Sequence, residues 1–234
     1  SSEITATPTT LVLGADLQVA IKVHNIGTKE AKSITVRMYN GDPKKGGTKV
    51  DEKVIASIKG GASAPLTLQW TKVTPVGVHH LFVNVDPDAK IVERKKENNQ
   101  AILGVRILPP IDVSVSVNDL LLKPAFPAPG KSVEFTVSVK NNGGIPAKQV
   151  EVAFYLGDPK AGGTLVGSVQ TIASIGAASQ EIARVSSASL AQGKYTLFIV
   201  ADPNNKLSDA DRSNNQTKKD FEVSPRMDLL ITSQ

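Results

Sequence analysis

The chain has 234 residues, of which 40% are hydrophobic, 4% are aromatic and 21% are charged, with a formal net charge of +5 and no cysteine. The apolar content suffices for a packed core, so a wholly disordered chain is excluded, and the length fits one large domain or two ordinary ones. Without cysteine, a disulfide framework, a thiolate zinc site and a cysteine nucleophile are excluded.

Most of the chain repeats at an offset of 116 residues. Asn25-Ile-Gly27 returns as Asn141-Asn-Gly143, and the turn that begins at Gly41 returns at Gly157. A constant offset over this distance indicates two copies of one domain. We therefore predict domains at 1–108 and 109–224, joined at Leu108-Pro109-Pro110, where the prolines stiffen a short connector.

Each copy is predicted to be an all-β domain. Apolar residues alternate with polar ones over 17–23 and again over 133–139, which is the period of a strand with one buried face. Glycine, proline, asparagine and aspartate separate such segments at short intervals. About seven strands in each copy predict two tandem immunoglobulin-like antiparallel β-sandwiches.

The repeated motifs resemble those of the CARDB family, the cell-adhesion-related domains of prokaryotic surface proteins. The resemblance rests on the Asn-x-Gly motif at the end of a strand, on Tyr-x-Gly-Asp-Pro at Tyr39 and Tyr155, and on the acidic turn that ends in Asn-Asn. It implies an immunoglobulin-like sandwich, an extracellular or cell-surface location, and a spacer or adhesive role. It implies no particular ligand.

Carboxylates gather in the acidic turn of each copy. Calcium takes six to eight oxygen ligands, so the turn of the second copy is a candidate calcium site. Four basic residues beside the turn of the first copy make that copy the weaker candidate. The calcium candidates are Asp202, Asp209 and Asp211, and the weaker set is Asp86, Asp88 and Glu93.

The alternative to a calcium site is a structural turn. Asp-Pro sequences open turns, and asparagine side chains bond to nearby backbone and fix a hairpin. No cofactor other than calcium is expected. The residues assigned to structural turns are Asn25, Gly27, Asn141, Gly143, Asn98, Asn99, Asn214 and Asn215.

Other candidate sites favour structural interpretations. The three histidines, at 24, 79 and 80, are not repeated in the second copy, and no nucleophile motif accompanies them, so we expect no enzyme. The glycine-rich segment 41–48 lacks the order of a phosphate-binding loop and is predicted to join two strands. Trp70 has the phase of Leu68 and is predicted to lie in the core.

The positive charge does not indicate nucleic-acid binding. Residues 1–108 hold 15 Lys and Arg against 10 Asp and Glu, whereas residues 109–224 hold 11 of each. Basic residues are not interleaved with aromatic ones as base stacking requires. The excess fits anionic polymers of a cell envelope. Membrane insertion is excluded, because no apolar run approaches about 20 residues.

Residues 225–234 match the start of the second copy and are predicted to begin a third repeat or to form a linker strand. Met227–Ile231 is equivalent to Ile111–Val115, whereas the first copy lacks most of this opening strand. A spare strand docks on a sheet edge, so we expect head-to-tail self-association.

The preferred function is a non-catalytic stalk or adhesion module that spaces other domains and contacts neighbouring repeats, surface proteins or polysaccharide. One alternative is an accessory substrate-binding module of an extracellular hydrolase. The other is a calcium-stiffened adhesin repeat.

Overall fold

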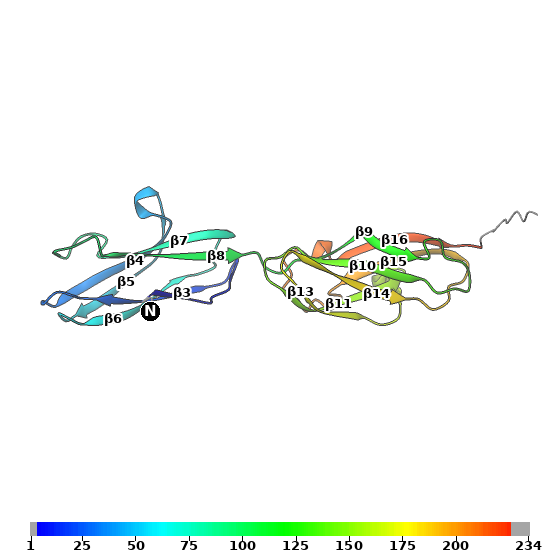
Figure 1. Cartoon of the computed structure of the whole chain (residues 1–234), viewed down its shortest axis with the longest axis horizontal. Coiled ribbons are helices and arrows are strands. Elements are labelled where there is room, and N and C mark those ends of the chain that lie inside the picture. The colour runs from blue at the N-terminus through cyan, green and yellow to red at the C-terminus, as the bar shows by residue number, and fades with distance from the viewer. Residues whose placement is uncertain (1–3, 226–234) are drawn as a thin grey trace, which may run out of the picture. The chain divides into compact units, whose positions relative to one another are not determined.

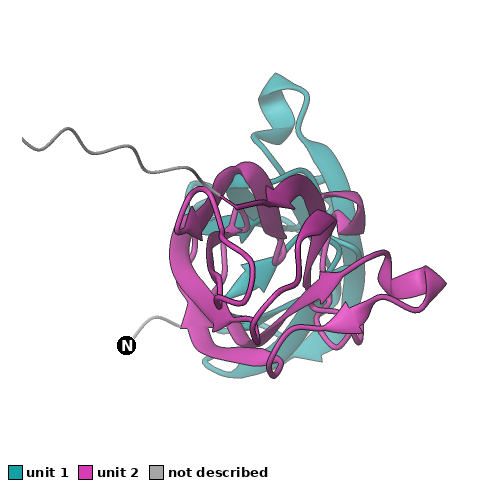
Figure 2. Ribbon diagram, turned by 90° about the vertical axis from the view of Figure 1, so that its right-hand side faces the viewer, with its two compact units in different colours: residues 1–109 teal, residues 110–234 magenta. Residues whose placement is uncertain are grey.

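A computed structural model describes residues 4–225 and divides the chain into two compact units, Ser1–Pro109 and Pro110–Gln234 (Figure 2). The division lies between the two prolines of the predicted connector. Each unit has a hydrophobic core of its own. Residues 226–234, expected to begin a third repeat, lie outside the described residues.

The part of unit 1 that the structure describes consists of strands and one single-turn helix (Figure 1), and its first two strands are short. The strands are β1 (Ile4–Thr7), β2 (Leu11–Val12), β3 (Leu17–His24), β4 (Ala31–Asn40), β5 (Thr48–Ile58), β6 (Ser63–Trp70), β7 (Gly77–Val85) and β8 (Gln100–Leu108).

These strands form the two-sheet sandwich that the sequence predicts. One sheet has the order β1-β3-β6 and the other has the order β2-β8-β7-β4-β5. One pair departs from the antiparallel pattern, because the two residues of β2 run parallel to β8, with Leu11 beside Ile107. Between β1 and β2 the chain crosses from one sheet to the other.

The alternation predicted for β3 is confirmed. Leu17, Val19, Ile21 and Val23 are buried between exposed neighbours, because successive side chains of a strand point to opposite faces. Trp70 is 8% exposed at the end of β6, which confirms its prediction as a core residue.

Unit 2 repeats this architecture. Its strands are β9 (Val113–Lys123), β10 (Glu134–Asn141), β11 (Ala147–Leu156), β12 (Thr164–Leu165), β13 (Gln170–Ile175), β14 (Ser179–Ser186), β15 (Gly193–Ala201) and β16 (Gln216–Val223). One sheet has the order β14-β10-β9. The other has the order β12-β11-β15-β16, and β13 pairs with a different stretch of β11.

The opening strand differs between the units. β9 pairs with β10 in two stretches, Val113–Val115 and Leu120–Lys123, with a register shift between them. At the 116-residue offset, β1 is equivalent to the second stretch alone. The described part of unit 1 therefore contains no counterpart of the first stretch.

The two cores place their aromatic rings on different strands. In unit 2 the Phe221 ring lies 5.5 Å from the Tyr195 ring and 5.6 Å from the Phe135 ring, measured between centroids. The equivalents of these residues in unit 1 are Val105, His79 and Val19. There the aromatic partner comes from β6 instead, since Trp70 lies 5.4 Å from His79 in an edge contact.

The described helices are three single turns, η1 (Pro43–Lys45), η2 (Pro159–Ala161) and η3 (Arg212–Asn214). The first two lie in the Gly-Asp-Pro segments. Asp42 caps η1 by accepting a hydrogen bond of 2.9 Å from the Lys44 amide. The segment 41–48 thus joins β4 to β5, as predicted. None of the helices in the described range has the length and hydropathy needed to cross a membrane.

Candidate functional site

The asparagine of each Asn-x-Gly motif connects the two sheets of its sandwich. Asn25 follows β3, and its Nδ2 donates to the Ile58 carbonyl at the end of β5 (2.9 Å) and to the Lys29 carbonyl (2.7 Å). Its Oδ1 accepts a hydrogen bond of 3.1 Å from the Gly27 amide. One side chain therefore closes its own turn and also bonds the opposite sheet.

Asn141 makes the same contacts in unit 2, where it is 1% exposed. Its Nδ2 lies 2.9 Å from the Ile145 carbonyl and 3.2 Å from the Ile175 carbonyl, and its Oδ1 accepts from the Gly143 amide at 3.1 Å. A Cβ at Gly143 would lie 2.0 Å from the Pro110 carbonyl oxygen, so only glycine fits here.

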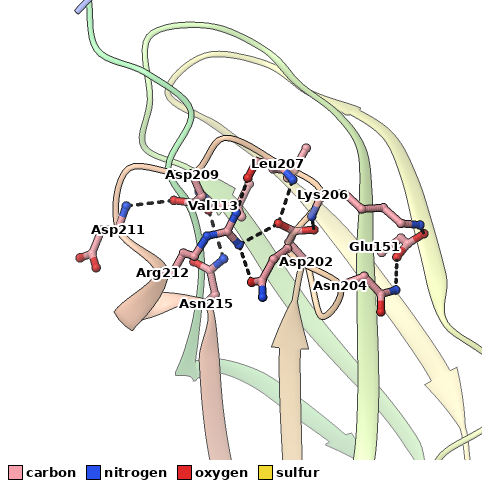
Figure 3. A network of polar contacts seen from close by, with 11 residues as sticks. Val113, Glu151, Asp202, Asn204, Lys206, Leu207, Asp209, Asp211, Arg212 and Asn215 are labelled. Carbon is pink, nitrogen blue, oxygen red and sulfur yellow. Dashed lines mark hydrogen bonds and ion pairs between the residues drawn. The ribbon is translucent and has the colours of Figure 1, made fainter. Parts of the chain in front are cut away.

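The acidic turn of each unit is anchored by the aspartate of its Asp-Pro sequence. Asp202 follows β15 with a φ of 47° and is 3% exposed. Its carboxylate accepts hydrogen bonds from the amides of Lys206 (2.8 Å) and Leu207 (3.0 Å), and from Arg212 Nη1 (3.1 Å), as Figure 3 shows. The turn therefore folds around a buried, paired carboxylate.

Asp86 has the same role in unit 1, with a φ of 45° and 7% exposure. Its carboxylate accepts from the amides of Lys90 (2.9 Å) and Ile91 (2.8 Å). Position 96, equivalent to Arg212, is Lys96. The backbone contacts are thus common to both units, whereas the ion pair belongs to unit 2.

The other two calcium candidates of unit 2 also accept hydrogen bonds from protein groups, and Figure 3 shows those of Asp209. Asp209 Oδ2 lies 3.1 Å from the Val113 amide and 3.1 Å from Asn215 Nδ2. Asp211 caps η3, and its hydrogen bonds from Ser213 lower its pKa. Asp209 thereby holds the start of β9 against the acidic turn.

The weaker calcium candidates of unit 1 bond to different partners. Asp88 forms a bidentate ion pair with Arg37, at 2.6 and 2.9 Å, on the outer face of the sheet. Glu93 accepts a hydrogen bond from Asn99 Nδ2 at 3.1 Å, and Asn98 is exposed. The structure therefore does not bring Asp86, Asp88 and Glu93 together at one point.

Within residues 4–225, no three His, Cys, Asp or Glu side chains form a group suited to a metal ion. A calcium ion in unit 2 would have to displace the protein donors from Asp202 and Asp209. The buried Oδ1 atoms of Asn214 and Asn215 have no hydrogen-bond partner in the described structure. These two atoms are the free acceptors beside the turn, and the calcium hypothesis stays a prediction.

The asparagine pairs bond differently from the expectation. The second asparagine of each pair bonds to a carboxylate of the acidic turn, and Asn214 bonds to the start of unit 2. Asn215 and Asn99 reach Asp209 and Glu93, while Asn214 Nδ2 donates to Asp112 Oδ1 at 2.9 Å. The last of these contacts spans 102 residues, so no local pattern could reveal it.

The histidines are not brought into one site. His24 is exposed on β3. His79 is half-buried, with Nδ1 at 3.1 Å from Asn40 Oδ1 and Nε2 at 2.8 Å from the Pro75 carbonyl. His80 is exposed on the opposite face of β7.

Sequence reasoning missed a hollow between the sheet edges of unit 1. It has a volume of about 350 Å³ and lies beside Ala6, Leu17 and Val105. The equivalents of Ala6 and Val105 in unit 2 are the larger Leu122 and Phe221. Comparing side-chain size across the repeat would have indicated this difference.

The comparisons with known proteins return one family model, CARDB, which matches residues 3–102 and 112–219. Similar solved structures include the CARDB domain of a Pyrococcus furiosus protein in complex with di-metal ions, at 24% identity and a TM-score of 0.41. It covers 49% of this chain and 89% of that chain.

Two further structures each cover 45% of this chain. One, from Geobacter metallireducens, is 28% identical with a TM-score of 0.38, and the match covers 92% of its own chain. The other, a domain of a Methanosarcina acetivorans putative cell surface protein, is 25% identical with a TM-score of 0.36, and the match covers 89% of its own chain. No curated protein matches.

Unit 1 should lose stability in acid through one ion-pair cluster. Hydrogen bonds from Arg37 lower the pKa of both Glu52 and Asp88 below their ordinary values. A carboxylate with a lowered folded-state pKa stabilises the fold above its unfolded pKa, and this contribution disappears as the pH falls through the folded value. The loss should begin near pH 5 and continue below about pH 4.

The sole tryptophan, Trp70, reports on unit 1 alone. Arg37→Gln should flatten the pH dependence of the urea midpoint measured by tryptophan emission. Lys206→Gln, which removes the partner of Glu151 in unit 2, is the matched control and should leave it unchanged. A wild-type midpoint that is constant from pH 6 to pH 3 would contradict the prediction.

The calcium hypothesis predicts heat on calorimetric titration with calcium and a higher melting temperature of unit 2. Asp209→Asn should remove both effects, because it replaces one of the three candidate carboxylates with a neutral amide of the same size. Glu93→Gln, at the equivalent position of unit 1, is the control. The hypothesis fails if the wild-type chain gives no heat and an unchanged melting temperature.

Proposed function

Since the chain belongs to the CARDB family of cell-adhesion-related domains, in two tandem copies, we propose that it is a non-catalytic stalk segment of a large prokaryotic surface or secreted protein. Its role is to space and present other domains outside the cell.

The path of the chain through unit 2 is the observation that supports this role. The chain enters beside η3, where Asn214 bonds to Asp112, and it leaves beyond the pair of Gly193 with Val223. These points lie at opposite ends of β16. A sandwich whose two ends are so placed adds its full length to a stalk.

This arrangement also places a pulling force along the strands. β9 has 11 residues, or roughly 36 Å at about 3.3 Å per residue. Because β9 lies antiparallel to β10 over two hydrogen-bonded stretches, a force along it loads several bonds together. The short proline connector adds little slack between units.

Single-molecule pulling tests the stalk role. The chain held at its two ends should unfold in two separate force peaks, each lengthening it by roughly 350–400 Å, since about 110 residues extend at ~3.6 Å each. Phe135→Ala, which empties a fully buried site of unit 2, should lower the force of one peak only. Unfolding of both units without resolved force peaks would contradict the proposal.

Self-association through Met227–Ile231 is a second part of the proposal. Leu229 and Ile231 are equivalent to Val113 and Val115, which are 0% and 7% exposed in unit 2, so this segment has the pattern of a core-forming strand. Deletion of residues 225–234 should abolish any oligomer seen in sedimentation. An oligomer that persists after the deletion would refute the proposal.

A further inference from the structure

The outer face of the larger sheet in unit 1 carries a row of apolar side chains. Tyr39 pairs with Phe82, which pairs with Ile102, so the three project from the same face. Their sequence neighbours Met38, Leu81 and Val83 are buried in the core, which places this row on the solvent side. Ile102 is 53% exposed.

The row widens along β7. His80 and Val78 follow Phe82 at every second position and share its face, and Val78 is 69% exposed. His80 pairs with Gly104, whose Cβ position is open on all sides, so nothing on β8 shields the ring. We name Tyr39, Phe82, Ile102, His80 and Val78 the outer row.

Unit 2 places charged residues on the equivalent face. Lys218, in place of Ile102, holds its Nζ 5.8 Å from the centre of the Phe198 ring. Asp220, in place of Gly104, accepts a hydrogen bond of 2.6 Å from Thr196. Unit 2 keeps Tyr155 and Phe198 at the places of Tyr39 and Phe82. The same fold thus forms with charged residues at the other two positions, so Ile102 and Gly104 of unit 1 are not required for folding.

Planar polar groups lie directly beside the outer row. Arg37 is fixed by ion pairs with Glu52 and Asp88. Gln100 Nε2 donates to Asn84 Oδ1 at 3.0 Å. Such a combination of rings with oriented hydrogen-bonding groups suits a sugar, since apolar C–H faces pack on rings while hydroxyls bond to amide, guanidinium and carboxylate groups.

The size of the outer row argues against a protein partner. Strands lie about 4.8 Å apart and alternate residues about 6.7 Å apart, so five outward side chains cover roughly 160 Å². A stable protein interface buries about 800 Å² on each partner. The row is therefore large enough for a few sugar rings and too small for a stable protein contact.

The charges around the outer row favour an acidic ligand. Exposed Arg106 pairs with Val78 at one edge of the row, and Lys49 pairs with Tyr39 at another. In unit 2 the residue equivalent to Arg106 is Glu222. Unit 1 also carries the whole excess of positive charge, 15 against 10. Carboxylate-bearing sugars complement this arrangement.

We propose that the outer row of unit 1 binds a carboxylate-bearing polysaccharide, with sugar rings packed on Phe82, Tyr39 and Ile102 and carboxylates paired with Arg106 and Lys49. This activity goes beyond the stalk role, because a stalk needs no ligand. It also assigns different tasks to the two units, since unit 2 has the charged face.

Affinity electrophoresis in gels containing polygalacturonate, alginate or hyaluronan tests the proposal. The 234-residue chain should be retarded by at least one of these polymers, and Ile102→Lys/Gly104→Asp should weaken retardation at least tenfold. This variant installs the residues of unit 2 and leaves the net charge unchanged. Its fold is checked by circular dichroism and by Trp70 emission.

Val54→Lys/Ala56→Asp is the matched control, since it adds the same charges at the same spacing on β5 and should bind like the wild type. Arg106→Glu should weaken binding to polygalacturonate more than to its methyl ester. The proposal is overturned if no acidic polymer retards the chain, or if the face-exchange variant binds as the wild type does. If the chain binds polygalacturonate and its methyl ester equally well, the proposal that the ligand is acidic is wrong.

Discussion

Each sandwich depends on one amide that joins its two sheets. Asn25 follows a strand of the smaller sheet and Asn141 ends one, and each donates to the carbonyl that ends a strand of the larger sheet. A buried carbonyl without a donor costs about 1–3 kcal/mol, more than the net gain from an ordinary hydrogen bond. The amide therefore fixes the spacing of the sheets at that end. Val139 and Ile175 are fully buried close to it.

The acidic turns lie at the same end of each sandwich. They share a buried aspartate but differ in the charged side chains around it. Both turns fold around a buried aspartate that accepts two backbone amides. Unit 2 adds Arg212 to that carboxylate, whereas unit 1 directs Arg37 to the outer face of the sheet. The common part of the turn is the backbone, and the charged side chains differ between units. Duplication thus retained the architecture while the surfaces diverged.

The sequence was sufficient for the repeat, the strands and the core. Alternation over residues 17–23 and the phase of Trp70 predict burial because hydrophobic burial is periodic along a strand. The parallel pairing of β2 with β8 was not predicted, because a strand of two residues is too short to show the alternation of apolar and polar side chains. The contacts of Asn214 with Asp112 and of Asp209 with Val113 also escaped it, because they join segments about 100 residues apart. Whether charged or apolar residues cover a sheet is readable from sequence only once the strand register is known.

The aromatic residues of the two cores lie on different strands, and this difference affects whether the tandem copies exchange strands during folding. Adjacent repeats of similar sequence can trade strands and become trapped in misassembled forms. Here β6 brings Trp70 to a site beside His79, whereas the residue at the same register position in unit 2 is Ser187, opposite Val133, and β16 supplies Phe221. If β6 entered unit 2, its indole would take the place of the small, buried Ser187, and β14 in unit 1 would leave the place of Trp70 unfilled. Both errors are penalised, by overpacking or by a cavity. The difference between the two cores therefore disfavours strand exchange between neighbouring units that share one fold.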